Sequence, residues 1–327
     1  MKVIEMRRAG TTAAVLFAAV LQSACTLGVI EHSFDRKLSV DGPVRIEVVT
    51  GSGKIIVRVG VSGQVRIHGD VRASGLIPMS EGRRVKGIAE NPPIEQIGNV
   101  IRIGKKSQSE GMVYGGIAYS IETPADTQLD ARTGSGGIEV SAIRGQVKLS
   151  SGSGSLQADK IGDDVNIHTG SGICRVSRVA GRLTFSLGSG TLEAEEIAQE
   201  VRGNCGSGQV TLQNVDGRVG IETGSGTLRV SGAKADLRAS TSSGRLQVSG
   251  NPAPRTYWEL SSSSGAVDLA APQGASFLLH ARTDSGALET MLPITIEEQS
   301  KRELRARVGA SEARVDIRTA SGSIRIH

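Results

Sequence analysis

Serine is the residue whose type and spacing in this chain first suggest chemistry. Eleven serines are each followed by glycine and, three positions after the serine, by an apolar residue: Ser52, Ser135, Ser153, Ser171, Ser189, Ser207, Ser225, Ser243, Ser264, Ser285 and Ser321. A serine hydroxyl acts as a nucleophile when a G-x-S-x-G elbow exposes it beside a base. That motif does not occur in the sequence. We therefore interpret the serines as parts of a repeated structural corner.

Other residues that could carry chemistry lack the grouping that chemistry needs. The histidines are scattered without metal-ligand spacing: His32, His68, His168, His280 and His327. Glu193, Glu195 and Glu196 could suggest a lyase or glycosidase pair, but Glu193 and Glu195 fall at outward strand positions, where solvated charge is the default. Residues 98–107 have the wrong glycine spacing for a phosphate-binding loop. We predict no catalytic residue, no metal site and no cofactor.

The spacing of the serines defines a repeat. From Ser135 to Ser243 the interval is 18 residues six times in succession, and the later intervals are 21, 21 and 36 residues. Position +3 after each serine is apolar, position +5 is mostly apolar, the residue between them is usually polar, and apolar residues recur at positions +12 and +14. This period-two alternation predicts two strands per repeat, each with one buried face. We expect no helix after the N-terminal segment.

Equal repeats in equal phase predict stacked coils. The fold class that we expect is an all-β, single-stranded parallel β-solenoid (a β-helix, right-handed) with 18-residue coils and a two- or three-sided cross-section. Glycine supplies 43 of 327 residues, whereas there are only four Phe, three Tyr and one Trp. We expect the glycines beside each serine to adopt backbone angles closed to other residues, and the serine to bond neighbouring backbone. A thin aliphatic interior would leave little room for rings.

The flanks of the repeat are less regular. We interpret residues 25–40 as a tether, 41–130 as irregular N-terminal coils and a cap, 131–250 as the regular solenoid, and 251–327 as looser C-terminal coils and a cap. Solenoid ends need caps because they expose strand edges. Residues 83–93 are expected to form a loop.

The first 24 residues have the features of a secretory signal peptide. Positive charges precede a short apolar run, and Cys25 follows small residues. This site resembles the lipobox of bacterial lipoproteins, which implies lipidation of Cys25, although Leu21 lies one position earlier than the family favours. Plain cleavage after Ala24 is the alternative.

The other two cysteines occupy different positions in the repeat. Cys174 falls at the inward +3 position, and Cys205 lies beside the glycine corner about two coils away. A disulfide needs Cα atoms within about 7 Å of each other. We therefore predict that Cys174 and Cys205 are unbridged.

The repeated units resemble a known bacterial family. The Thr-Gly-Ser-Gly-Xaa-Ile/Leu units, led in by Tyr-Ser-Ile-Glu-Thr-Pro-Ala-Asp at residues 119–126, are similar to the family of candidate adhesins that carries the domain DUF4097. The resemblance covers roughly residues 41–327. It implies an exported or envelope-associated β-solenoid, often a lipoprotein, and it supplies no catalytic motif.

A flat polar face is the best candidate for binding. Outward positions +13 and +15 of the second strand form two columns, from which we select Lys148, Asn166, His168, Thr184, Arg202, Asn204, Glu222 and Arg238. Such a face could bind an extended polymer such as a glycan, and an ordinary hydrated surface is the alternative. Tyr257 and Trp258 are candidate aromatic contacts with a ligand, since both residues are enriched at interfaces. A role in covering the core is equally open for them.

Two classes of function follow from these features. We expect a non-catalytic exported protein of the bacterial cell envelope, an adhesin or scaffold whose partner is a glycan or an envelope protein, with membrane contact through the lipid alone. The alternative is a polysaccharide-active enzyme on a parallel β-helix, which would need clustered acidic groups on one face. Loss of residues 1–24 lowers the formal net charge from +5 to +3, and this mild charge, with export, argues against nucleic acid as a partner. The oligomeric state stays open.

Overall fold

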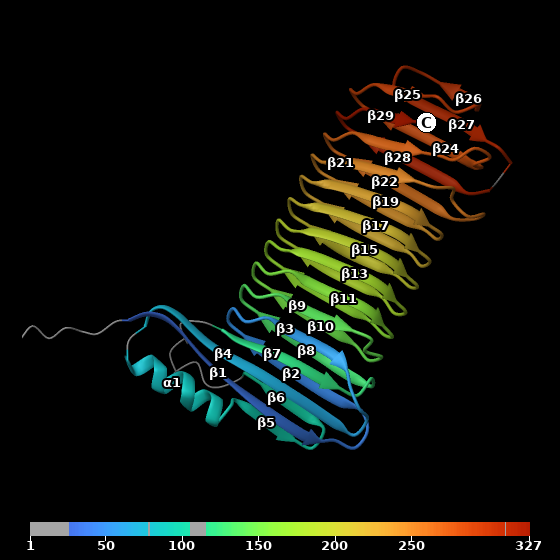
Figure 1. Ribbon diagram of the computed structural model, residues 1–327. Coiled ribbons are helices and arrows are strands. Elements are labelled where there is room, and N and C mark those ends of the chain that lie inside the picture. Colours follow the sequence, from blue (N-terminus) through green and yellow to red (C-terminus); the bar gives the residue numbers. More distant parts are fainter. Residues whose placement is uncertain (1–25, 78, 105–115, 311) are drawn as a thin grey trace, which may run out of the picture.

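A computed structural model describes residues 26–77, 79–104, 116–310 and 312–327 of the chain. These residues form a long stack of coils in which the strands lie in two sheets (Figure 1). The predicted parallel β-solenoid is confirmed, and its cross-section is two-sided. The predicted signal peptide and Cys25 lie outside the described residues.

The first sheet, called sheet A, contains 14 strands. In spatial order they are β1 (Thr26–Ser39), β4 (Gln64–Ile77), β7 (Ile117–Thr123), β3 (Ile55–Val59), β9 (Ile138–Ser141), β11 (Leu156–Ile161), β13 (Ile173–Val179), β15 (Thr191–Ile197), β17 (Gln209–Val215), β19 (Thr227–Ala233), β21 (Arg245–Ser249), β23 (Val267–Ala270), β29 (Ile324–Ile326) and β25 (Leu288–Thr290).

The second sheet, called sheet B, contains 15 strands. In spatial order, starting from the C-terminal end of the stack, they are β26 (Thr295–Gln299), β27 (Glu303–Val308), β24 (Phe277–Thr283), β28 (Arg314–Thr319), β22 (Tyr257–Ser262), β20 (Leu237–Thr241), β18 (Val219–Thr223), β16 (Val201–Cys205), β14 (Leu183–Leu187), β12 (Val165–Thr169), β10 (Val147–Ser151), β8 (Thr127–Thr133), β2 (Val44–Thr50), β6 (Val100–Ile103) and β5 (Ile94–Ile97).

Each regular coil contributes one strand to each sheet, and like residues lie above like. Val147 pairs with Val165, which pairs with Leu183, so the parallel register advances by one 18-residue repeat per coil. The inward positions predicted from the alternation are buried along the regular coils, and Leu288 near the C-terminal end is half-buried. The core is mostly aliphatic, and Phe185 has space because Gly203 occupies the equivalent position in the next coil, where a Cβ would lie 2.6 Å from the ring.

The glycines beside the repeat serines from Ser135 onward are required by close approach between coils. The prediction that they use backbone angles closed to other residues is wrong, because none of these corner glycines has a positive φ. Instead, a Cβ on Gly152 would lie 2.5 Å from the carbonyl oxygen of Gly134 in the preceding coil, and a Cβ on Gly190 would lie 2.5 Å from that of Gly172. Real Cβ atoms do not approach oxygen so closely. Corner packing therefore excludes side chains at these positions.

A second set of hydroxyl groups closes the corner from inside. In several coils, the buried residue two positions before the repeat serine accepts a hydrogen bond from the glycine N–H three residues later, as in Gly154 N to Ser151 Oγ at 2.7 Å and Gly136 N to Thr133 Oγ1 at 3.0 Å. Cys205 takes the same place, and its Sγ accepts from Gly208 N at 3.2 Å. The repeat serines were expected to bond the backbone through their side chains. This is so at Ser285, whose Oγ donates to Ala320 O at 3.2 Å. The side chains of the repeat serines are exposed, and it is mainly their main-chain N–H groups that make the regular bonds to the adjacent coil.

The opposite corner of each regular coil uses a left-handed residue. Positive φ angles between 55° and 63° recur at 18-residue intervals in Ala142, Lys160, Arg178, Glu196 and Asn214. Gly232 continues the series with a φ of 67°. The polar and glycine-containing turns here, such as residues 162–164, indicate the corner in the sequence, but the left-handed residue carries no signal because its type differs from one coil to the next.

The N-terminal flank corrects two predictions. The segment predicted as a tether forms β1, which pairs antiparallel with β4 over their whole length. The segment predicted as a loop forms most of helix α1 (Met79–Glu90), which packs on β1 and β4 through Val85 and Ile88. The helix has few apolar residues, so its period was not apparent in the sequence. Among the described elements, α1 packs against β1 and β4 at the end of the stack (Figure 1).

The C-terminal coils stack out of chain order. Strand β28 lies between β22 and β24, so the last coil inserts before the coil that precedes it in sequence. At the corner, Ser321 N bonds Ser263 O at 2.9 Å, and Ser285 N bonds Ala320 O at 2.9 Å. The antiparallel strands β26 and β27 then end sheet B and cap this end of the stack.

Because the corner glycines pack against the neighbouring coil, substituting them should lower the stability of the protein more than substituting a glycine on the outer face. Gly190→Ala should lower the free energy of unfolding by about 3 kcal/mol, because its Cβ must displace the backbone of the neighbouring coil. Gly220→Ala should stay within about 0.5 kcal/mol of wild type, since a Cβ there meets nothing within 4 Å. Chemical denaturation measures both variants, and equal losses would contradict the steric explanation.

Candidate binding groove on sheet B

The structure brings the predicted binding residues together in two columns on the outer face of sheet B. Parallel pairing aligns column 1, which contains Lys148, Asn166, Thr184, Arg202, Gly220 and Arg238. The same pairs align column 2, which contains Ser150, His168, Ser186, Asn204, Glu222 and Ser240. All eight predicted binding residues are exposed. The structure therefore places these eight side chains on the outer face of sheet B, where the repeat predicted them.

Both columns continue beyond the regular repeat. Column 1 extends through Glu259, Asp316, His280, Arg305 and Glu298. Column 2 extends through Ser261, Arg318 and Arg282. Sequence reasoning missed this continuation, because the out-of-order insertion of β28 hides which residues become neighbours.

A groove of about 1010 Å³ lies over this continuation, on column 2 and the adjacent glycine-serine corners. Asn204 and Glu222 line one end, whereas His280, Arg282 and Arg318 line the other. Between them the walls and floor are hydroxyl-bearing or small residues, among them Ser240, Ser242, Ser261, Ser263 and Thr241. The groove exists because column 2 has short side chains in two neighbouring coils, at Ser240 and Ser261. Longer side chains, Glu222 and Arg318, follow in the coils on either side. The remaining predicted residues do not line it.

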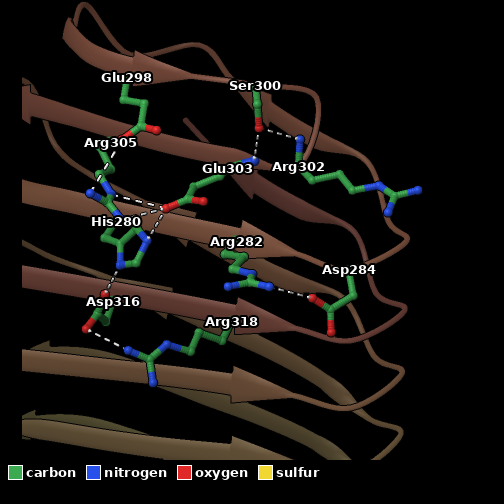
Figure 2. A network of polar contacts seen from close by, with 10 residues as sticks. All are labelled: His280, Arg282, Asp284, Glu298, Ser300, Arg302, Glu303, Arg305, Asp316 and Arg318. Carbon is green, nitrogen blue, oxygen red and sulfur yellow. Dashed lines mark hydrogen bonds and ion pairs between the residues drawn. The ribbon is translucent and has the colours of Figure 1, made fainter.

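His280 lines the C-terminal end of the groove. Figure 2 shows the network of polar contacts that holds its ring. Its Nδ1 lies 2.9 Å from Asp316 Oδ1, and its Nε2 lies 3.0 Å from Glu303 Oε1. The contact with His280 lowers the pKa of Glu303, and contact with the Arg305 guanidinium, 2.9 Å away, acts in the same direction. The imidazole is therefore held between two carboxylates from the strands on either side.

Asp316 is the centre of this network. Its Oδ2 accepts a hydrogen bond from the Tyr257 hydroxyl at 2.6 Å and contacts Arg318 at 3.3 Å. The hydrogen bond to Asp316, with a contribution from burial, raises the pKa of Tyr257 to about 12. The two adjacent arginines, Arg318 and Arg282, keep exposed guanidinium groups on the groove side, with Arg282 contacting Asp284 at 3.5 Å.

Comparison with known proteins places this arrangement in a family. The family model described as Toastrack DUF4097 matches residues 95–327. The chain belongs to the Toastrack family. This identifies the stacked, two-sided coils as a Toastrack domain and agrees with the resemblance in the sequence.

Solved structures include two that are similar to this Toastrack protein. A candidate cell adhesion protein from Clostridium sporogenes is 11% identical, and the match covers 90% of this chain and 99% of that one with a TM-score of 0.21. A candidate adhesin from Bacteroides fragilis is 12% identical, with 90% and 97% covered and a TM-score of 0.29. No curated protein matches this chain.

The two candidate aromatic contacts of this Toastrack protein have different positions. Trp258 is fully buried, and its Nε1 donates to Ala235 O at 3.1 Å. Of the two roles open for Trp258, contact with a ligand is therefore wrong, because the ring is buried in the core. Tyr257 is 39% exposed, but its hydroxyl is bound to Asp316 beside the groove.

Of the remaining candidates, Cys205 lines the groove, whereas Cys174, Glu193 and Glu195 lie apart from it. Cys174 and Cys205 are free and buried, as predicted, and burial raises the pKa of the Cys174 thiol to about 12. Glu193 and Glu195 are exposed on sheet A, where Glu193 pairs with Arg175 at 3.1 Å. Among the described residues, no group of three His, Cys, Asp or Glu side chains could hold a metal ion. Of the helices that the structure describes, none has the length and apolarity to cross a membrane.

The role of Asp316 can be tested by removing its charge. Asp316→Asn should lower the free energy of unfolding by about 1–3 kcal/mol, because an amide cannot accept from both His280 and Tyr257 as the carboxylate does. The pKa of Tyr257 should fall from about 12 towards its ordinary value. Thermal or chemical unfolding and ultraviolet titration of tyrosine measure these two effects.

Asp268→Asn is the matched control, since Asp268 occupies a half-buried outward position on β23 in sheet A. It should leave both quantities unchanged. If the Asp316 and Asp268 variants behave alike, Asp316 does not organise the network.

Proposed function

We propose that this protein is a non-catalytic binding protein of the bacterial envelope, an adhesin or scaffold, and that the groove on sheet B binds an extended polar polymer, a glycan. The observation that carries the proposal is the groove of about 1010 Å³ with a hydroxyl-bearing floor on an otherwise regular sheet. A scaffold of stacked coils holds such a surface rigidly.

The chemistry of the groove suits a hydroxylated chain. Ser240 and Ser261 lie on adjacent strands, so their hydroxyl groups repeat at about 4.8 Å along the stack. Each hydroxyl both donates and accepts hydrogen bonds, as sugar hydroxyl groups do. Short serine side chains also lose little conformational entropy when a ligand orders them. The ends then offer an amide and a carboxylate at Asn204 and Glu222, and guanidinium groups at Arg282 and Arg318.

One observation favours a second candidate function, a polysaccharide-active enzyme. His280 lies at the end of the groove between Asp316 and Glu303, and a hydrogen-bonded imidazole and carboxylate can transfer protons. Against this, both imidazole nitrogens are already bonded to carboxylates, which leaves neither nitrogen directed at a ligand. Release of reducing ends or unsaturated sugars from a bound glycan would favour the enzyme over the binding protein.

Filling the groove tests the binding proposal. Ser261→Arg places a long side chain on the floor and should weaken binding to the glycans retained by wild type by about tenfold or more, equivalent to roughly 1.4 kcal/mol. A glycan array identifies these ligands, and titration calorimetry measures the affinity. Ser150→Arg is the matched control, because Ser150 is half-buried in the same column but lies outside the groove. Equal weakening by both variants, or by neither, would contradict binding in the groove.

The position in the envelope is a separate proposal that rests on the sequence of the first 25 residues. We expect residues 1–24 to be removed on export and Cys25 to carry a lipid that tethers the protein to a membrane. Labelled fatty acid should attach to wild type in the native host and be lost in Cys25→Ser. Attachment to both, or to neither, would contradict lipidation at Cys25 and favour plain cleavage after Ala24.

A further inference from the structure

The four ends of the two sheets are protected unequally. Three terminal strands are short: β5 has four residues, β25 has three, and β26 has five with a register shift. The fourth, β1, has 14 residues and forms the end of sheet A. Proteins keep exposed edges short or irregular because a long regular edge is a template for another strand. The edge of β1 is the exception in this molecule.

The outer edge of β1 presents main-chain groups that are paired with no other strand. Two of its outward carbonyl groups accept from side chains, that of Asp35 from Arg36 at 2.9 Å and that of Ser39 from Gln96 at 2.8 Å. Val40 N bonds Gly63 O at 3.0 Å and belongs to the same antiparallel ladder, so even-numbered residues direct their N–H and C=O groups towards β4. The odd-numbered residues direct theirs outward, and within the described part of the chain no strand pairs with them. These are Val29, Glu31, Ser33, Asp35, Lys37 and Ser39.

The edge is also held in place from behind. Phe34 is buried against Tyr119, with ring centroids 6.4 Å apart, and Ile30 packs against the core on the side covered by α1. The odd-numbered side chains from Val29 to Ser39 are exposed. A partner strand would therefore meet an edge already in strand geometry.

The charges along this edge are unbalanced within one chain. Lys37 lies opposite Arg66 on β4, a pairing of like charges. Arg66 contacts Glu122 at 3.5 Å, whereas Lys37 contacts no carboxylate among the described residues. Glu31 lies opposite Arg72, which it contacts at 2.6 Å. Like charges directly across a strand pair are unfavourable, so Lys37 would be stabilised by an acidic group on its free side.

We infer that a second copy of this chain pairs with β1, antiparallel and across a two-fold axis at Phe34. This register places Glu31 of each copy opposite Lys37 of the other, and pairs residues 29–39. A two-fold axis perpendicular to the sheet allows only shifts by multiples of two residues, because the outward main-chain groups must pair. A shift by two puts Glu31 opposite Asp35, or Asp35 opposite itself, and either arrangement sets like charges together. The shift by four that puts Asp35 opposite Lys37 pairs residues 33–39 alone, so it forms a shorter interface.

The shape of the molecule permits this pairing. Strand β1 is at one end of the stack and the C-terminus is at the other (Figure 1). The two solenoids therefore extend away from the seam, which is the interface between the two β1 strands. Sheet A then runs through both copies without an open edge at the seam. The pairing is isologous and closed, and it produces a dimer rather than a filament.

Charge reversal at Lys37 tests the dimer. The full chain, in a density-matched detergent, should sediment as a dimer, and Lys37→Glu should raise the dimer dissociation constant by about tenfold or more, because two attractive pairs become repulsive. The single variant should fold at least as stably as wild type, since Glu at position 37 would face Arg66. The double variant Glu31→Lys with Lys37→Glu restores opposite charges and should recover the dimer.

Lys148→Glu is the control, because Lys148 is exposed on sheet B far from the seam. It should leave the dissociation constant unchanged. Wild type that is monomeric at all concentrations, larger species than a dimer, or a dimer indifferent to Lys37→Glu would each overturn the proposal. Failure of the double variant to restore the dimer, with an unchanged thermal midpoint, would overturn this register.

Discussion

The close approach of successive coils at the glycine-serine corner is the constraint on which the rest of the structure depends. Parallel strands in both sheets must advance by one strand spacing per coil, so the corner backbone must advance by the same step. At that step the carbonyl oxygen of Gly172 occupies the place that a side chain on Gly190 would need. The main-chain bond from Ser189 N to Gly170 O, 2.7 Å long, completes the contact. The abundance of glycine is a consequence of this packing rather than of unusual backbone angles.

The same constraint determines what the interior and the surface can be. Two sheets joined by tight corners enclose a narrow core, which small aliphatic residues fill, and a ring such as Phe185 needs a glycine in the next coil. On the outer face, every coil repeats the same two positions in register, so side chains become columns. A stretch of short residues in one column, from Ser240 to Ser261, is then enough to open a groove between longer neighbours.

The sequence was most informative where the repeat is regular. The 18-residue spacing placed inward and outward residues correctly, including Arg202 and Asn204 on the candidate face. It did not predict the continuation of the columns to His280 and Arg318, because spatial order departs from chain order when β28 inserts beside β22. Helix α1 and strand β1 were also missed, since their structure depends on packing against each other rather than on an internal period. Non-local contacts of this kind leave little trace in local residue patterns.

Hydrogen exchange of the wild-type protein tests the central claim most directly. If coil packing at the corner holds the stack, the amides that bond the preceding coil there, among them those of Ser171, Ser189 and Ser207, should exchange as slowly as amides in the middle of the sheets. They should also become exposed together with the sheets on global unfolding. Fast exchange at these corners, independent of slow exchange in the flanking strands, would show that the corners are passive loops and would contradict the account.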